Sequence, residues 1–209
     1  MPRVVNLAVL VSGAGTTLEA LADRILAGQL PAQIVLVVAD RLGTPAIERA
    51  RRRGLDTVVR PLRTAASGAA WTEEVAPELE RREVDLVVLA GFLSVVPNEF
   101  LARFRDRVLN LHPSLLPKYG GPGMYGLRVH AAVLLAGEKE TGVTVHRVTE
   151  AVDAGPILYQ IRVPVLPDDT PERLRTRLHP VEVRALVATI SRYARDELPL
   201  PHRSPTEGG

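Results

Sequence analysis

The chain of 209 residues contains no cysteine. Disulfide bonds, thiolate metal sites and cysteine nucleophiles are therefore excluded, and the absence fits a cytoplasmic protein. Two other residue types are scarce: the only lysines are Lys118 and Lys139, and asparagine occurs only at positions 6, 98 and 110. An arginine-rich chain with few asparagines has two alternative origins, a thermophilic organism or a GC-rich genome.

The sequence also lacks a long hydrophobic run and a strong excess of charge. No apolar stretch reaches 18 residues, so no membrane-spanning segment is expected. Residues 4–11 are apolar but lead directly into a glycine turn without a small-residue cleavage site, which favours a buried strand over a signal peptide. The formal net charge of +2 requires no nucleic-acid partner. The basic run 51–53 ends a predicted helix, where the helix dipole and solvent account for it, and a specific anion site is the less favoured alternative.

Apolar runs alternate with helical patterns over the first half of the chain. Strands that alternate with helices predict βαβ units, and hence an α/β fold with a doubly wound, mainly parallel sheet. The near-continuous valine and leucine runs fit strands that are buried on both faces. The predicted strands are 4–11, 33–39, 55–59, 85–90 and a strand ending at 112, and the predicted helices are 16–27, 45–53, 71–82 and 97–105.

The second half of the chain departs from this alternation. A helix over 127–136 is followed by two successive strands, 141–148 and 157–165, so the sheet is expected to gain antiparallel strands joined by a hairpin loop. A long last helix over 171–195 has Thr170 as its N-cap, and Pro180 is a point where it kinks or divides. We therefore predict a single domain over residues 1–197 and a disordered, proline-rich tail over 198–209.

The strand end Asn110-Leu111-His112 carries the most informative pair of side chains. Side chains alternate along a strand, so Asn110 and His112 should project from one face at the carboxyl edge of the sheet, where open α/β sheets bind ligands. An amide that stabilises an oxyanion, beside an imidazole that moves protons near neutral pH, suits acyl transfer. The alternative is an asparagine that satisfies a turn and a histidine that packs in the core.

The segment 12–18, Ser-Gly-Ala-Gly-Thr-Thr-Leu, lies between the first strand and the first helix. Its glycines allow the backbone to approach a ligand, and the free N–H groups of the helix start attract phosphate. Leu18 breaks the dinucleotide-binding pattern and the lysine of a P-loop is missing, so a small phosphorylated substrate is favoured over a dinucleotide, despite Asp40 after the second strand. The alternative is a tight turn of the kind found in any doubly wound fold.

Asp153 lies in the hairpin loop, directly before Ala-Gly-Pro. Aspartate is common in turns, so a purely structural role is the alternative to a catalytic one. A carboxylate near His112 would favour the imidazolium and raise the pKa of His112.

The remaining histidines are weaker candidates. His146 alternates with valines and either faces the site or packs in the core, and His130 lies on the helix after the glycine-rich loop. His179 and Glu182 lie three residues apart on one helix face, but two ligands without a third make a metal site unfavoured. His202 lies in the tail and is expected to be inert.

Together these segments resemble the glycinamide ribonucleotide formyltransferases, a folate-dependent branch of the formyltransferases, over about residues 4–195. The motif Asn-Leu-His-Pro-Ser-Leu-Leu-Pro at 110–117, followed by Asp-x-Gly-Pro at 153–156, resembles folate-dependent formyltransferases as a group. The loop at 12–18 resembles the ribonucleotide branch. The resemblance implies a Rossmann-like fold and a role in purine biosynthesis.

The resemblance also implies a reaction, in which the amine of glycinamide ribonucleotide attacks the formyl group of 10-formyltetrahydrofolate directly, without a metal or a covalent enzyme intermediate. Asn110 and protonated His112 would stabilise the oxyanion, and Asp153 would raise the pKa of His112. The expected partners are these small molecules, with no membrane and no nucleic acid, for a monomer or a homodimer. The ribonucleotide would contact Gly15, Thr16, Thr17 and Glu182, and the folate would contact Leu93, Ser94, Val95, Val96 and Asn110.

The chain departs from the family pattern in four places, one of which is the segment 183–186 after Glu182, where the usual aromatic-proline pair is missing. Ala14 stands where asparagine is frequent, and Gly68 stands where many members carry an arginine that contacts the folate. Arg60 or Arg63 would be the substitute for that arginine. The segment 120–126 is longer than in many members and resembles a glycine-rich variant form.

Four other functions compete with this interpretation. Methionyl-tRNA formyltransferases share the catalytic core but add a tRNA-binding domain, for which this chain is too short and barely basic. Formyltetrahydrofolate deformylases share the three catalytic residues but carry an N-terminal regulatory domain. A sugar-nucleotide N-formyltransferase fits the phosphate loop less well. A non-catalytic relative that binds folate or a phosphosugar is disfavoured because all three catalytic residues are present.

Overall fold

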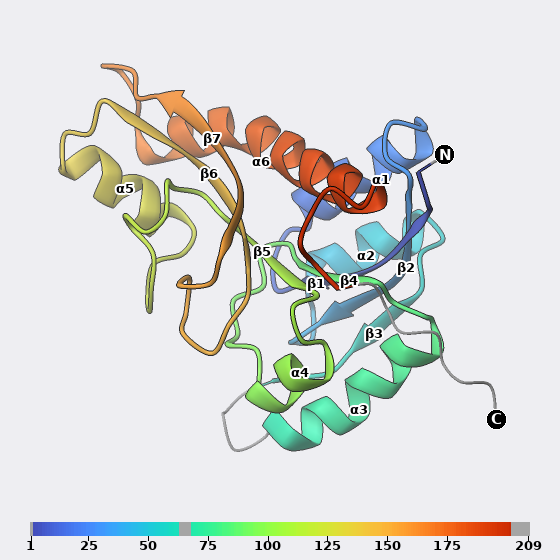
Figure 1. The fold of residues 1–209 in the computed structure, drawn as a ribbon. Helices are drawn as coiled ribbons and strands as arrows, with labels where there is room; N and C mark the ends of the chain where they lie inside the picture. The colour runs from blue at the N-terminus through green and yellow to red at the C-terminus, as the bar shows by residue number, and fades with distance from the viewer. Residues whose placement is uncertain (1, 63–67, 202–209) are drawn as a thin grey trace.

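The chain folds around one seven-stranded sheet in the order β3-β2-β1-β4-β5-β6-β7 (Figure 1). The computed structural model describes residues 2–62 and 68–201. The pairs among the first five strands are parallel, and β6 pairs antiparallel with both β5 and β7, so the predicted α/β class with late antiparallel strands is confirmed. The strands are β1 (Val5–Val11), β2 (Ala32–Ala39), β3 (Thr57–Val59), β4 (Leu86–Leu89), β5 (Val108–His112), β6 (Glu140–Arg147) and β7 (Ile157–Pro164).

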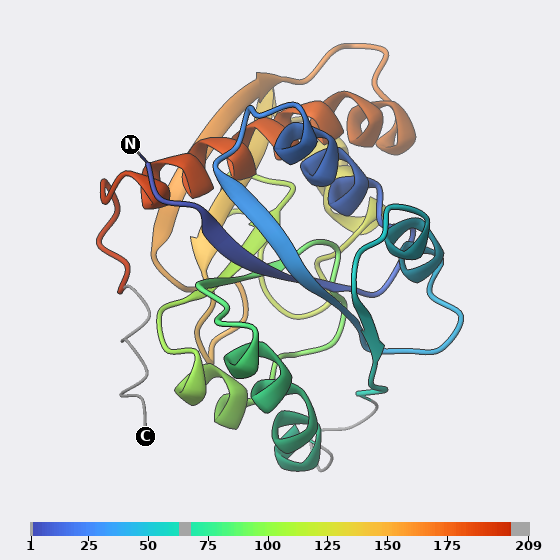
Figure 2. The same cartoon turned by 90° about the vertical axis from the view of Figure 1, so that its right-hand side faces the viewer.

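Helices cover both faces of the sheet, as Figures 1 and 2 show. On one face, α1, α2 and α6, together with α5 beside the antiparallel strands, form a hydrophobic core with the sheet. On the opposite face, α3 and α4 form a second hydrophobic core with the sheet. None of the helices within the described ranges is long and apolar enough to cross a membrane. The helices are α1 (Thr16–Leu26), α2 (Pro45–Arg52), α3 (Gly68–Arg81), α4 (Asn98–Arg103), α5 (Leu127–Leu135) and α6 (Pro171–Ala194).

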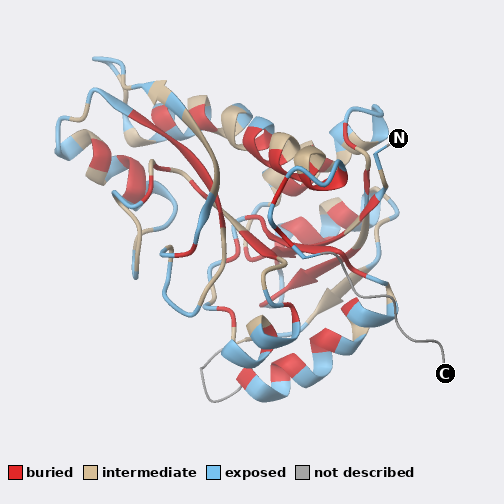
Figure 3. Ribbon diagram, in the orientation of Figure 1, coloured by how far each residue is buried: buried red, intermediate tan, exposed pale blue. Residues whose placement is uncertain are grey.

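Strand β1 shows why the apolar runs form the centre of the sheet. Its Leu7, Val9 and Val11 pack into the core on one face, whereas Ala8 and Leu10 pack into the core on the other. Because helices cover both faces, both sets of alternating side chains are apolar. The central strands are accordingly among the most deeply buried segments in Figure 3.

Helix α6 runs without a break from Pro171 to Ala194, so Pro180 does not divide it (Figure 1). The hydroxyl of Thr170 accepts a hydrogen bond from the N–H of Arg173 (3.3 Å), as predicted for the N-cap. Proline removes one backbone hydrogen bond from a helix. The helix packs against α1, α5, β6 and β7, and this packing outweighs the loss at the exposed Pro180.

The strand order reverses between β1 and β4. β1 leads through α1 to β2 on one side, and β4 leads through α4 to β5 on the other. Open α/β sheets bind ligands in the crevice at such a point, outside the carboxyl ends of the strands. The loops 12–15 and 90–97, which follow these two strands, therefore diverge where a ligand is expected.

The prediction of a disordered tail from residue 198 is wrong for residues 198–201. Leu198 and Leu200 are 8% and 5% exposed and belong to the core on the α6 side of the sheet. The hydroxyl of Tyr193 also donates a hydrogen bond to the carbonyl of Pro201 (3.1 Å). Prolines exclude a helix here, but they leave the intervening leucines free to pack. The rest of the tail, including His202, lies outside the described residues.

Leu200→Ala tests whether this segment belongs to the folded core. Truncating a buried leucine removes its packing, so we expect the free energy of unfolding to fall by about 2–4 kcal/mol in urea titrations. Leu135→Ala is the matched control, because Leu135 is 91% exposed, and it should change stability by less than about 0.5 kcal/mol. Equal effects of the two substitutions would contradict the burial of Leu200.

Candidate active site

The structure brings Asn110, His112 and Asp153 together. Asn110 and His112 project from the same face of β5, as their alternation predicts, and Asp153 reaches both from the loop between β6 and β7. Asn110 Nδ2 donates to Asp153 Oδ1 (3.2 Å), and His112 Nδ1 lies 3.4 Å from Asp153 Oδ2. The side chains of His112 and Asp153 are only 4% and 9% exposed, so their interaction is little weakened by solvent.

The loop that carries Asp153 is tightly constrained. Asp153 has a φ of 54°, in the left-handed region that non-glycine residues rarely adopt. Two residues later, any Cβ on Gly155 would lie 1.8 Å from the carbonyl oxygen of Arg147, so only glycine fits. The N–H of Gly121, from the glycine-rich loop, donates to Asp153 Oδ2 (3.0 Å). Backbone strain of this kind persists where the surrounding structure holds a functional side chain in place.

His146 is a fourth member of the cluster, and the sequence left its role open. It pairs with Asn110 across β5 and β6, which places both side chains on one face. Its Nδ1–H donates to the carbonyl of Arg147 (3.0 Å), so its Nε2 carries a lone pair and accepts from Asn110 Nδ2 (3.1 Å). Both hydrogens of the Asn110 amide are therefore engaged, one by His146 and one by Asp153. The signal that could have found His146 is the strand register, which sequence patterns do not fix.

The hydrogen bonds of His112 fix its tautomer. Its Nε2 lies 2.8 Å from the carbonyl oxygen of Tyr119. A carbonyl oxygen only accepts, so Nε2 carries the hydrogen in the neutral ring. Nδ1 is then the nitrogen that gains or loses a proton, and it faces the carboxylate of Asp153.

Asp153 acts on the pKa of His112 in the predicted, upward direction, but burial is the larger effect and the net shift is downward. Burial lowers the pKa of His112 below its ordinary value; the charge of Asp153 and the bond to Tyr119 oppose this effect without reversing it, and His146 adds to the lowering. His112 is therefore neutral at pH 7. Burial raises the pKa of Asp153, but His146, His112 and the N–H of Gly121 outweigh burial and hold that pKa below its ordinary value.

The predicted phosphate loop lies at the strand-order reversal. Gly15 precedes α1 with a φ of 77°, and a Cβ there would lie 2.5 Å from Cβ of Ala46 on α2, so the loop requires glycine. The first helical N–H with an acceptor is that of Glu19, which bonds to the Gly15 carbonyl (3.0 Å). The N–H groups before it, including those of Thr16 and Thr17, are the ones a helix start offers to an anion.

The predicted folate-binding segment 93–96 borders the same crevice. The N–H of Leu93 donates to Ser12 Oγ (2.8 Å), which ties the two loops together. Leu93 and Val95 are 46% and 71% exposed, so their apolar side chains are available to a ligand. Val96 is different, because its side chain is buried in the core beside α3 and α4, which leaves only its backbone for a ligand.

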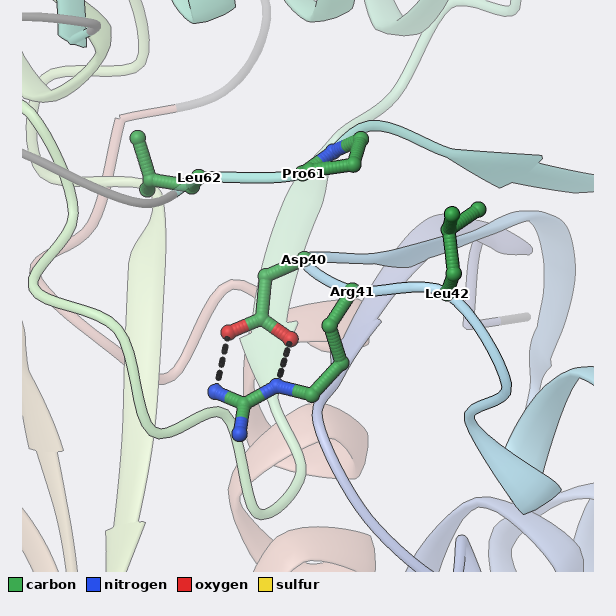
Figure 4. Close-up of a pocket in the computed structure, with 5 residues that line it drawn as sticks. All are labelled: Asp40, Arg41, Leu42, Pro61 and Leu62. Atoms are coloured by element: carbon green, nitrogen blue, oxygen red, sulfur yellow. Dashed lines mark hydrogen bonds and ion pairs between the residues drawn. The ribbon is translucent and has the colours of Figure 1, made fainter.

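Asp40 holds this segment through a hydrogen bond to Ser94. Asp40 also lines a pocket of about 260 Å³, which Figure 4 shows. Its carboxylate forms a two-bond fork with Arg41 (3.0 and 2.8 Å) and accepts from Ser94 Oγ (2.5 Å). Burial raises the pKa of Asp40, but the hydrogen bonds from Arg41, Ser94 and Ser12 outweigh it and keep the pKa below its ordinary value. These partners occupy the carboxylate that a dinucleotide ribose would need.

Gly68 stands where an arginine that contacts the folate is expected, and the residue that would replace this arginine stays a prediction. Gly68 begins α3 and is buried, with its missing Cβ 3.1 Å from Pro97. Arg60 is held by an ion pair with Glu74 (2.9 Å), and Arg63 lies outside the described residues. In the basic run 51–53, Arg51 pairs with Glu48, and Arg53 pairs with Glu19 and Asp23, in keeping with a solvated face.

A second cluster of titratable groups lies between α5 and α6. Arg175, His179 and Glu182 follow one another on a face of α6, and the charge of Arg175 acts on His130 of α5 as well as on His179 and Glu182. His130 also feels the charge of His112, which links this cluster to the catalytic group. Burial raises the pKa of Glu182 to about 7, against the charge of Arg175.

Two atoms of this cluster are buried without a partner. Among the described residues, His130 Nδ1 and His179 Nε2 are buried and make no hydrogen bond. Buried polar atoms without partners cost stability, so they mark a place where a ligand would complete the bonding. No group of three or more metal-binding side chains occurs in the described part of the chain, so the pair His179 and Glu182 has no third metal ligand there.

Comparison with known proteins gives consistent matches. The Formyl transferase family profile matches residues 5–190. The chain is 39% identical over 203 residues to a phosphoribosylglycinamide formyltransferase of Mycobacterium tuberculosis, a match that covers 97% of this chain and 91% of that protein. The glycinamide ribonucleotide transformylase 1 structure from Symbiobacterium toebii matches with a TM-score of 0.85 and 38% identity, over 95% of this chain and 91% of that chain.

A longer relative also matches. The chain is 42% identical over 179 residues to the trifunctional purine biosynthetic protein adenosine-3 of Drosophila melanogaster. That match covers 85% of this chain but spans only 13% of the longer protein.

Glu182→Gln tests the half-buried carboxyl of Glu182. The pKa of Glu182 is raised to about 7 in the folded protein, so its contribution to stability is fully present below the unfolded pKa and is lost as pH rises through about 7. The variant should therefore be more stable than the wild type at pH 8, by about 1–3 kcal/mol, and equally stable at pH 4. Urea unfolding at both pH values measures the difference.

Glu150→Gln provides the matched control, because Glu150 is exposed. This variant should show the same stability difference from the wild type at both pH values. A Glu182→Gln variant that behaves in the same way would contradict the raised pKa of Glu182.

Proposed function

This chain belongs to the formyl transferase family, and we propose that it transfers the formyl group of 10-formyltetrahydrofolate to the amine of glycinamide ribonucleotide, a step of purine biosynthesis. The observation that carries the proposal is the cluster at the end of β5, where Asp153 holds both Asn110 and His112. An amide donor, a proton carrier and a carboxylate in contact suit direct acyl transfer to an amine.

His112 acts first as a base in this reaction. Its lowered pKa leaves Nδ1 unprotonated at neutral pH, so it can accept the proton that the attacking amine loses. The carboxylate of Asp153, 3.4 Å from Nδ1, then stabilises the imidazolium. The bond from Nε2–H to the Tyr119 carbonyl is compatible with both protonation states, so the ring does not need to turn.

The tetrahedral intermediate carries negative charge on the former carbonyl oxygen. The imidazolium of His112 and an N–H of Asn110 are the groups that stabilise this charge. Asn110 must release one of its present acceptors to do so, and its 3.2 Å bond to Asp153 is the longer of the two. The proton on His112 then passes to the leaving nitrogen, which returns the ring to its neutral form and leaves no covalent enzyme intermediate.

Two parts of the crevice support the choice of substrates. Gly15, Thr16 and Thr17 offer the N–H groups of the α1 start to a phosphate, and Glu182 offers a carboxyl to the glycinamide end. Leu93 and Val95 offer exposed apolar surface to a flat ring system, as the pterin of a folate requires. Ser94, Val96 and Asn110 complete the proposed folate contacts, with Val96 acting through its backbone. We infer a cytoplasmic location and a monomer or a homodimer from the sequence alone.

Three alternatives remain distinguishable by substrate. A formyltetrahydrofolate deformylase would give the formyl group to water, and a sugar-nucleotide N-formyltransferase would give it to an amino sugar. A non-catalytic relative would bind without turnover. The predicted phosphate loop and the half-buried Glu182 favour the ribonucleotide.

The purified protein should consume 10-formyltetrahydrofolate only when glycinamide ribonucleotide is present. Loss of the formyl donor and formation of formylated ribonucleotide are measured together, with an amino-sugar nucleotide in a parallel reaction. Donor loss without any amine would support the deformylase instead, and no loss under any condition would support the non-catalytic relative.

His112→Ala should lower kcat by about 100- to 10,000-fold, because the proton carrier is removed. The circular dichroism spectrum should stay that of the wild type, which separates loss of chemistry from loss of fold. Turnover near the wild-type value would remove His112 from the mechanism.

Asp153→Asn should lower kcat and shift the pH–activity profile toward acid. The carboxylate raises the pKa of His112, so its removal lets burial lower that pKa further. Asp56→Asn is the control, because the side chain of Asp56 is 69% exposed and is remote from the cluster in sequence. A profile at the same position in Asp153→Asn and wild type would show that Asp153 does not tune His112.

A further inference from the structure

The carbonyl that holds His112 belongs to a residue in an uncommon conformation. Tyr119 has a φ of 57°, in the left-handed region. This conformation costs free energy for a residue with a side chain, so neighbouring contacts must hold it. The orientation matters because the Tyr119 carbonyl is the acceptor for His112 Nε2 at 2.8 Å.

The side chain of the same residue supplies such a contact. The hydroxyl of Tyr119 donates to Oε1 of Glu138 (2.9 Å), which lies between α5 and β6. Lys118 Nζ donates to the same oxygen (2.8 Å), and Ser114 Oγ donates to the carbonyl of Lys118 (2.6 Å). Hydrogen bonds at Lys118 and at the Tyr119 hydroxyl thus hold the loop after β5 in place.

The two residues after Tyr119 connect the same loop to Asp153. A Cβ on Gly120 would lie 2.5 Å from the Leu116 side chain and 3.1 Å from Cβ of Asp153, so the backbone packs directly against both. The next N–H, that of Gly121, donates to Asp153 Oδ2. A shift of this loop would therefore disturb the partners of both catalytic side chains.

We propose that the hydrogen bond between the Tyr119 hydroxyl and Glu138 is a clamp that holds the Tyr119 carbonyl against His112 Nε2. Tyr119 and Glu138 are positioning residues: they fix the hydrogen on Nε2 and so reserve Nδ1, beside Asp153, for proton exchange. The clamp itself is a structural claim, whereas its effect on turnover rests on the proposed formyl transfer.

Other charged groups near His112 are distinct from the clamp. Asp153 and His146 act on the pKa of His112 from the β6–β7 side, and His112 in turn lowers the pKa of His130 on α5. Glu138 is joined to His112 through Tyr119, so substitutions at Glu138 and Tyr119 should have one shared effect.

The test uses Tyr119→Phe, which removes the donor, and Glu138→Leu, which removes the acceptor with little change in side-chain volume. Histidine ring signals in ¹⁵N-labelled protein report the tautomer, and His112→Gln identifies the signals of His112. The wild type should show hydrogen on Nε2 alone, and both variants should show a mixture of tautomers. This readout does not depend on which reaction the protein catalyses.

Turnover provides the second measurement. Each variant should lower kcat by about 3- to 10-fold, as expected for the loss of one hydrogen bond, while KM for both substrates stays within about twofold. The double variant should be no slower than the slower single variant, because both substitutions break the same bond. The pH profile of both variants should move in the same direction.

Two matched controls separate the clamp from general effects. Tyr159→Phe removes a hydroxyl from a half-buried tyrosine of β7, and Glu140→Leu removes a nearby carboxylate that pairs with Arg162 instead. Both should keep the wild-type tautomer and turnover.

An unchanged His112 tautomer in Tyr119→Phe and Glu138→Leu would overturn the proposal, as would additive losses of kcat in the double variant. If the wild type transfers no formyl group, the proposed function fails, and the tautomer measurement alone decides whether the clamp exists.

Discussion

The carboxylate of Asp153 is the constraint on which the site depends. A buried carboxylate is costly unless its charge is neutralised and its oxygens accept hydrogen bonds. Asp153 accepts one hydrogen bond at each oxygen, from Asn110 on β5 and from the N–H of Gly121 in the glycine-rich loop, and His112 Nδ1 lies 3.4 Å away, where it can balance the charge once it is protonated. Displacing either segment would leave the carboxylate with an unsatisfied oxygen, so the charge links β5 to the conformation of the glycine-rich loop.

The two halves of the sheet accordingly supply different parts of the chemistry. The parallel half follows the rule for doubly wound folds, and its loops after β1 and β4 offer backbone N–H groups and apolar surface at the strand-order reversal. Such loops bind a ligand but contain no proton carrier. The antiparallel half adds β6 and its hairpin, which bring His146 and Asp153 beside the end of β5. In the proposed reaction, binding and proton transfer would thus meet at β5, the last parallel strand.

Most of the fold was predictable because the strands are buried on both faces and the helices between them are regular. Alternation along β5 also placed Asn110 and His112 on one face. The failures have physical reasons. Leu198 and Leu200 sit among prolines, which argue against a helix but not against burial. The role of His146 depends on register, and the bond of Tyr119 to His112 depends on one left-handed residue, which no local pattern indicates.

The protonation state of His112 was the least predictable feature, because burial lowers the pKa of the ring whereas the charge of Asp153 raises it. The burial that strengthens the attraction of Asp153 for an imidazolium also penalises the charged ring, and burial is the larger effect in the free protein. A neutral ring is what the first proton transfer requires. As negative charge develops on the substrate in the same dry site, it adds to that of Asp153 and shifts the balance toward the imidazolium. The carboxylate of Asp153 is therefore not sufficient to keep His112 protonated before the reaction starts. In the proposed reaction it would lower the free energy of protonating His112 as the tetrahedral intermediate forms.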